Sequence, residues 1–150
     1  MNKVHKDIQP LEDSLVKYIE QASMVLQKFL KETLVQAKQD LSLDEFNILF
    51  HLNMQEGIPQ QWIANHLLRD KTAIMRYIDN LSEKKLVKRM PDPNDRRVNL
   101  IFLSQRGKDL VLKLLPLAKN AFQEIEKNLD SDDLNTTKSI LRKINKKFHP

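Results

Sequence analysis

The spacing of apolar residues changes from a helical to a strand period near residue 86, and this change restricts the fold most. Asp70 is a good N-cap residue, and helical spacing follows it at Ile74, Tyr77, Ile78 and Leu81. Residues 86–90 and 97–103 then alternate as strands do, and residues 91–95 between them are rich in Pro, Asp and Asn, which favour turns. The second strand is expected to carry on one face Val98, Leu100 and Phe102. The pattern predicts a helix over 70–85 followed directly by a β-hairpin.

Helices are predicted on both sides of this segment. Residues 11–38 show a helical apolar period over a length of about 42 Å, more than a small globular domain needs. Ser42 and Glu45 form a capping-box pattern for a second helix that is expected to end near Gly57. This helix is expected to turn inward Phe46, Leu49, Phe50 and Leu52. With only two glycines in 150 residues, the chain is expected to be mainly α-helical.

Single capping residues, prolines and acidic residues predict the bounds of the remaining helices. Pro59 is expected to begin a helix over residues 60–67, since proline is tolerated in a first helical turn. Ser104 is expected to cap a helix over 104–129, which Pro116 should bend. The acidic residues after Ser131 favour the start of a last helix over 131–147.

The helices over 60–67 and 70–85 form a helix-turn-helix candidate, in which the second helix would lie in a DNA major groove. In the first turns of this second helix, the outward positions are Lys71, Thr72, Ala73, Met75 and Arg76. Thr72 can donate to a phosphate or a base, Ala73 and Met75 can touch thymine methyls, and Arg76 can bind guanine through two hydrogen bonds. The alternative is that this polar face is only solvated surface.

The charge distribution favours the DNA interpretation. The formal net charge is +5, and residues 69–106 hold ten basic and five acidic residues, so the whole excess lies in that quarter of the chain. At the hairpin tip, Asp95 is well placed to pair with Arg97 and to stiffen the hairpin. Arg96 is then left to meet a phosphate or enter a minor groove. The alternative interpretation of Arg96 and Arg97 is a solvated loop tip.

Other classes of site find no support in the sequence. There is no cysteine, hence no disulfide and no thiol switch. His5, His51, His66 and His149 are isolated in sequence, so no metal site is predicted, although His51 could line a ligand pocket. Trp62 and Phe102 are expected to be core residues. No catalytic constellation, phosphate-binding loop or cofactor motif is present, and no enzyme activity is expected. Without a secretory signal at Met1–Pro10 or a long apolar run, the protein is expected to be cytoplasmic and not membrane-bound.

The sequence resembles the MarR family of bacterial winged-helix transcriptional regulators. The Asp95-Arg96-Arg97 tip, which follows a Leu-Val-x-Arg strand, is the most specific part of the resemblance. The other matching residues are Leu41-Ser42, Phe46, Leu49, Gln60-Gln61-Trp62-Ile63-Ala64, Asp70-Lys71-Thr72, Arg76, Asp79, Leu81, Leu86-Val87, Arg89, Leu103-Ser104 and Gly107. Three positions depart from the family pattern: Pro59 stands in place of Thr, Ala73 in place of a hydroxylated residue, and Lys85 in place of Gly. Because glycine suits a left-handed C-cap, the helix before Lys85 is expected to end differently.

The resemblance implies a mainly α winged helix-turn-helix fold with one β-hairpin wing, forming a single domain over residues 1–150. Helices at about 11–38 and 104–147 would form the dimerisation lobe, and residues 42–103 the DNA-binding lobe. The resemblance also implies a homodimer that binds a pseudo-palindromic double-stranded operator and acts as a repressor. A small aromatic or anionic effector would release the repressor from DNA, and no residue that binds this effector is identified. The DNA-binding residues would be Lys71, Thr72, Ala73, Met75, Arg76, Asp95, Arg96 and Arg97. The alternative function is a winged-helix protein–protein adaptor without specific DNA binding.

Overall fold

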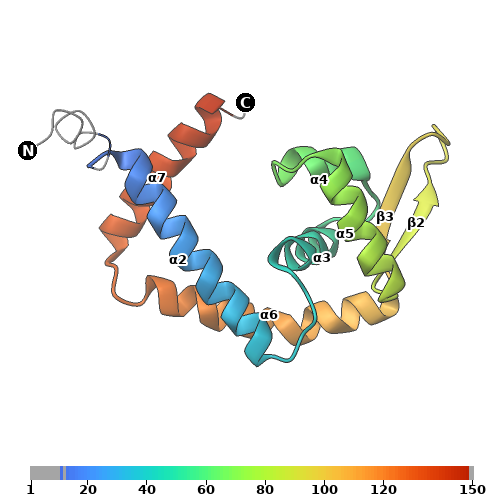
Figure 1. The fold of residues 1–150 in the computed structure, drawn as a ribbon, viewed down its shortest axis with the longest axis horizontal. Helices are drawn as coiled ribbons and strands as arrows, with labels where there is room; N and C mark the ends of the chain where they lie inside the picture. The colour runs from blue at the N-terminus through green and yellow to red at the C-terminus, as the bar shows by residue number, and fades with distance from the viewer. Residues whose placement is uncertain (1–10, 12, 149–150) are drawn as a thin grey trace, which may run out of the picture. The chain divides into compact units, whose positions relative to one another are not determined.

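The computed structural model describes residue 11 and residues 13–148. Its elements follow in the order α2 (Leu15–Gln36), α3 (Leu43–Met54), β1 (Ile58–Pro59), α4 (Gln60–His66), α5 (Lys71–Glu83), β2 (Val87–Pro91), β3 (Asn99–Leu103), α6 (Gln105–Glu126) and α7 (Ser131–Phe148) (Figure 1). The mainly helical prediction and the order of the helices and the hairpin are confirmed. His5, His149 and the segment examined for a secretory signal lie outside the described residues.

The chain divides into two compact units, and the boundary lies between Leu114 and Leu115, inside α6. The first unit contains α2 to β3 and the start of α6. The second contains the rest of α6 and α7, where Lys138 Nζ lies 3.2 Å from Glu126 Oε1. Pro116 follows the boundary closely within α6. The bend expected at Pro116 and the single-domain organisation stay predictions.

The sheet has three antiparallel strands in the order β1-β3-β2, one more than the sequence predicted. In the hairpin, Val87 pairs with Leu103 and Pro91 with Asn99. The third strand, β1, pairs Ile58 with Ile101 and Pro59 with Leu100. Pro59 therefore ends a short edge strand and is the N-cap of α4 without a side-chain cap, whereas the sequence placed it at the start of that helix.

The core of the first unit lies where α3, α5 and the sheet meet. Its fully buried side chains include Ile48, Leu49, Leu52, Ile74, Ile78, Leu81 and Ile101. The buried face of β3 carries Ile101 and Leu103, so Val98, Leu100 and Phe102 are on the opposite, half-buried side. Phe46 and Phe50 are half-buried as well. The expectation that Trp62 is a core residue is wrong, because 39% of its surface is exposed.

Three helices end in the same way, although the chain has few glycines. After α2, α4 and α5, the residues Lys38, Leu68 and Lys85 take left-handed backbone conformations with φ of 54°, 51° and 59°. At the end of α5, the Lys85 amide donates to the Ser82 carbonyl and the Leu86 amide to the Leu81 carbonyl, both over 2.9 Å. This pair of bonds is a Schellman motif. The expectation that α5 ends differently because it lacks glycine is therefore wrong.

Replacing Lys85 with glycine is expected to stabilise the protein by about 1 kcal/mol, because glycine adopts positive φ without steric cost. The free energy of unfolding in urea measures the change. Glu83→Gly is the matched control, because Glu83 is a right-handed helical residue of α5. This control should lose up to about 1 kcal/mol, and a loss of stability in both variants would contradict the interpretation.

The start of α6 is packed tightly against the end of α5. Ser104 Oγ donates to the Lys85 carbonyl over 2.6 Å and accepts from the Gly107 amide over 3.0 Å, which confirms Ser104 as the cap. Gly107 is close to the backbone of Leu86, and a Cβ at residue 107 would lie 2.1 Å from the Leu86 carbonyl oxygen. The base of the hairpin, the end of α5 and the start of α6 therefore form one joint.

Two histidines that are isolated in sequence meet in the structure. The rings of His51 in α3 and His66 in α4 have centroids 4.5 Å apart, and Trp62 stacks on His66 at the same distance. The two residues are 15 positions apart in the chain, so their sequence spacing does not indicate that the rings meet. No group of three or more His, Cys, Asp or Glu side chains that could hold a metal is present among the described residues.

Acid is expected to weaken the fold through His51. Burial and the neighbouring His66 lower the pKa of His51 below its ordinary value of 6.5. As the pH falls through 6.5, the unfolded chain binds a proton before the folded chain does, so stability falls between about pH 7 and pH 5. The thermal midpoint, followed by circular dichroism at both pH values, should drop less in His51→Gln than in the unchanged protein. An equal drop in both would assign the acid sensitivity to other groups.

Candidate nucleic-acid interface

The helix-turn-helix consists of α4, a short turn and α5. The turn passes through Leu68, whose left-handed backbone is closed by a bond from the Arg69 amide to the Ala64 carbonyl over 3.0 Å. Asp70 Oδ1 then accepts from the Ala73 amide over 2.8 Å, which confirms Asp70 as the N-cap of α5. The sequence folds this way locally because the turn and the cap satisfy the backbone groups that the two helix ends leave unpaired.

The outward face of α5 carries the residues predicted to read bases. Lys71, Thr72, Met75 and Arg76 are exposed, and Ala73 is half-buried. The inward face carries Ile74, Ile78 and Leu81 in the core. Tyr77, which the sequence placed on the buried stripe, is half-buried at its edge. The first turns of α5 therefore offer a polar surface on a firmly packed helix.

Ionic contacts from neighbouring elements hold α5 in place. Asp44 in the first turn of α3 accepts from Arg69 Nε and from the Tyr77 hydroxyl, each over 3.0 Å. At the other end of α5, Lys84 donates to the Asp40 carbonyl over 2.5 Å, and its Nζ lies 3.4 Å from Oε1 of the buried Glu45. Adjacent carboxylates at the start of α3 thus contact the turn before α5, the middle of α5 and its C-cap residue Lys84.

The hairpin is tied to α5 in a similar way. Arg89 of β2 places Nη2 2.6 Å from Asp79 Oδ1 on α5. The strand β2 lies beside α5, and in the view of Figure 1 the N-terminal end of α5 and the hairpin tip point away from the start of α6. The ion pair therefore links the hairpin directly to the helix that carries the reading surface.

The hairpin tip has the internal pair that the sequence predicted. Asp95 accepts from Arg97 Nε over 3.0 Å and from Arg97 Nη2 over 3.0 Å, and its backbone carbonyl accepts from the Val98 amide over 2.8 Å. The Arg97 hydrogen bonds lower the pKa of Asp95, and the same contact raises the pKa of Arg97. Arg96 is exposed and has no carboxylate partner within the part of the chain that the structure describes. The tip thus presents one unpaired guanidinium on a stiffened turn.

The residues that support the reading surface were not predicted as site residues. Asp44 and Tyr77 are 33 positions apart, and Glu45 and Lys84 are 39 positions apart. No pattern of residues close together in the sequence predicts such pairs. The one available signal was the capping box, confirmed at Ser42 and Glu45, because it placed both carboxylates at the start of α3.

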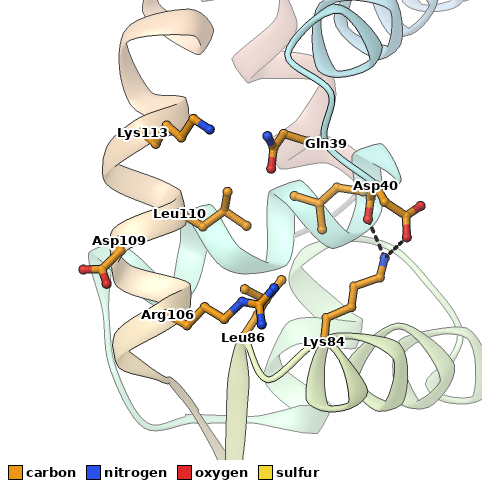
Figure 2. Close-up of a pocket in the computed structure, with 9 residues that line it drawn as sticks. Gln39, Asp40, Lys84, Leu86, Arg106, Asp109, Leu110 and Lys113 are labelled. Atoms are coloured by element: carbon orange, nitrogen blue, oxygen red, sulfur yellow. Dashed lines mark hydrogen bonds and ion pairs between the residues drawn. The ribbon is translucent and has the colours of Figure 1, made fainter.

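A cavity of about 410 Å³ lies beside the C-terminal end of α5, within the first unit. Figure 2 shows Arg106 and Lys113 of α6 directed toward it, opposite Gln39 and Asp40 from the segment between α2 and α3. Lys84 lines the same cavity and bonds Asp40. Arg106 and Lys113 have no carboxylate partner among the described residues. The cavity therefore combines apolar walls with unpaired positive charge.

Comparison with known proteins gives a consistent result. Residues 41–98 match the model of the MarR family. The chain is 28% identical to the HTH-type transcriptional regulator TcaR of Staphylococcus aureus (strain Newman), over 87% of this chain and 86% of that protein. It is 29% identical to the multiple antibiotic resistance protein MarR of Escherichia coli (strain K12), over 70% of this chain and 74% of that protein.

Solved structures agree with the sequence relatives. A mutant of Escherichia coli MarR complexed with operator DNA superposes with a TM-score of 0.81 and 26% identity, over 95% of this chain and 99% of that chain. Residues 41–98, which match the family model, contain the helix-turn-helix, the hairpin tip and the contacts of Asp44 and Glu45 with Tyr77 and Lys84. The chain is therefore similar to the MarR family of winged-helix transcriptional regulators, whose model matches residues 41–98.

Proposed function

We propose that the protein is a transcriptional regulator that binds double-stranded DNA sequence-specifically as a homodimer and represses from a pseudo-palindromic operator. The observation that carries the proposal is the pairing of an exposed, polar α5 face with a hairpin tip that keeps one guanidinium free. Lys71, Thr72, Ala73, Met75 and Arg76 would meet base edges or phosphates in the major groove. Arg96 would meet the backbone or the minor groove, and the Asp95–Arg97 pair would hold it there.

Exposed apolar side chains support the homodimer. In α2, large apolar residues are exposed at Leu15, Val16, Tyr18, Met24, Val25 and Val35. In α7 no residue is buried, and Ile140, Leu141 and Phe148 are exposed. Monomeric soluble proteins rarely leave so much apolar surface on individual helices. A second copy covering these helices would place two reading surfaces about one DNA turn apart.

The cavity beside Lys84 supports release by a small anionic effector. Arg106 and Lys113 could bind a carboxylate, and the leucines at residues 41, 86 and 110 could contact its apolar part. A ligand held there would lie next to the contact between Lys84 and Asp40, which fixes the end of α5. It would release DNA only if it bound the non-DNA geometry more tightly.

The alternative functions have less support. A protein–protein adaptor would not need an unpaired guanidinium on a stiffened hairpin. The relatives are transcriptional regulators, and we infer that this chain is likewise a regulator and not an enzyme. Among the described residues, no helix combines the length and apolarity needed to cross a bilayer. A DNA-binding regulator of this family would act in the cytoplasm.

Arg96→Ala tests the proposal. The variant should weaken binding to all duplexes and reduce the slope of log K against log salt by about one per protomer, because one phosphate contact is lost. Fluorescence anisotropy over a series of salt concentrations measures this, with a selected duplex and a scrambled duplex of the same composition. The matched comparison is Arg97→Lys, which keeps the charge at the tip but loses the two-donor pair with Asp95, and which should therefore keep the salt slope of the unchanged protein. The proposal fails if the unchanged protein binds both duplexes equally and Arg96→Ala changes neither.

A further inference from the structure

We propose that Tyr77, anchored by Asp44, is a positioning residue that presents Arg76 to the bases, so that base preference depends on a side chain turned away from the DNA. The inference rests on the proposed DNA-binding function. It starts from the one basic residue of the α5 face that lies over an aromatic ring. The Cζ atom of Arg76 lies 5.5 Å from the centroid of the Tyr77 ring.

This contact restricts the conformation of the Arg76 side chain. Neighbouring residues on a helix point about 100° apart, so the guanidinium of Arg76 must fold along the flank of α5 to reach the ring. Tyr77 is half-buried, and its hydroxyl donates to Asp44 Oδ2 over 3.0 Å. The ring is thus held at both its ends, by the helix backbone and by a carboxylate of α3.

The other arginines around α5 are held differently. Arg69 is paired with Asp44, Arg89 with Asp79, and Arg97 with Asp95. A carboxylate occupies the in-plane N–H groups of a guanidinium, which are the same donors that guanine requires. Arg76 has no carboxylate partner among the described residues. An aromatic face can hold a guanidinium while its N–H edge stays free, so Arg76 can be oriented and remain able to bind.

Orientation before binding has a measurable effect. Immobilising a long side chain on binding costs entropy, and a side chain that is already held loses less. The cost for one such side chain corresponds to about a three- to tenfold change in affinity. Tyr77→Phe keeps the ring and removes its bond to Asp44, so part of this advantage should disappear. Tyr77→Leu removes the aromatic face as well.

The matched control uses the second partner of Asp44. Arg69 donates to Asp44 Oδ1 over 3.0 Å and to Asp44 Oδ2 over 3.4 Å, and among the described residues no hydrogen bond, ion pair or ring contact joins it to Tyr77 or Arg76. Arg69→Gln therefore removes the ion pair with the same carboxylate, whereas Tyr77→Phe removes one hydrogen bond to it, and Arg69→Gln leaves the aromatic ring in place. Thermal midpoints should fall by similar amounts in the two variants, and only Tyr77→Phe should change base preference.

The experiment is a double-mutant cycle on base preference. The probes are a duplex selected by the unchanged protein from a random library and a scrambled duplex, and the readout is the ratio of their dissociation constants at one salt concentration. We expect Tyr77→Phe to lower this preference about three- to tenfold. In the Arg76→Ala background, Tyr77→Phe should lower it no further, because the two residues act as one unit.

Three results would overturn the inference while leaving the proposed function intact. They are independent effects of Tyr77→Phe and Arg76→Ala, an equal loss of preference in Arg69→Gln, and a gain of preference in Tyr77→Phe. The last would mean that Tyr77 holds Arg76 away from the DNA. If the unchanged protein shows no preference for any selected duplex, the proposed function itself fails, and this inference with it.

Discussion

Gly107→Ala is expected to destabilise the folded protein by about 3 kcal/mol or more, although alanine is the better helix former. The cause is local, because the added Cβ would lie 2.1 Å from the Leu86 carbonyl oxygen and 3.2 Å from Leu103 Cδ2. Neither the start of β2 nor that of α6 can move away freely, since the Ser104 amide also donates to the Leu86 carbonyl over 2.9 Å. Urea denaturation followed by circular dichroism measures the loss.

Asn120→Ala in the same helix is the control for the Gly107 variant. Asn120 is exposed, so this substitution tests helix propensity alone and should be neutral or stabilise slightly. If Gly107→Ala were as stable as the unchanged protein, the close approach of α6 to Leu86 would be absent in solution. Lower affinity for DNA would accompany the instability of Gly107→Ala, because the same joint carries the hairpin.

Arg76→Ala is expected to remove base discrimination worth about 1–3 kcal/mol at one position of each half-site. Binding to scrambled duplexes should weaken much less, because non-specific affinity comes from the sum of the phosphate contacts. Dissociation constants for a selected duplex and for single base-pair variants of it would measure the loss. At one position of the duplex, base-pair changes should no longer alter the dissociation constant of Arg76→Ala. That position identifies the base that Arg76 contacts.

Arg76→Lys separates charge from shape in this experiment. Lysine keeps the positive charge and loses the planar pair of donors that binds guanine. The variant should therefore keep the salt dependence of the unchanged protein and lose most of its discrimination. Full discrimination by Arg76→Lys would mean that Arg76 acts as a phosphate contact.

The correct sequence predictions concern interactions between residues close together in the chain. Asp70 caps α5 by accepting from Ala73, and the Asp95–Arg97 pair spans two positions. Such interactions depend on residue type and spacing, so a single sequence contains the information for them. The same holds for the hairpin, whose strands are joined by a turn of recognisable composition.

The missed features depend on residues far apart in the chain. The strand β1 has two residues, one of them Pro59, and it exists because β3 pairs with it. The approach of His51 to His66 depends on how α3 and α4 pack, and so does the partial exposure of Trp62. The left-handed Lys85 was missed for another reason, because its strain is offset by packing of Leu86 and by the bond from Ser104.

Trp62 gives the chain an optical reporter at its reading end. It is the single tryptophan of the sequence, and it stacks on His66 at an interplanar angle of 9° within the first unit. Its emission therefore reports on the helix-turn-helix alone, whereas circular dichroism averages over all helices, including α7. If the two units unfold separately, the two signals will give different midpoints, and a single coincident transition will show that they unfold together.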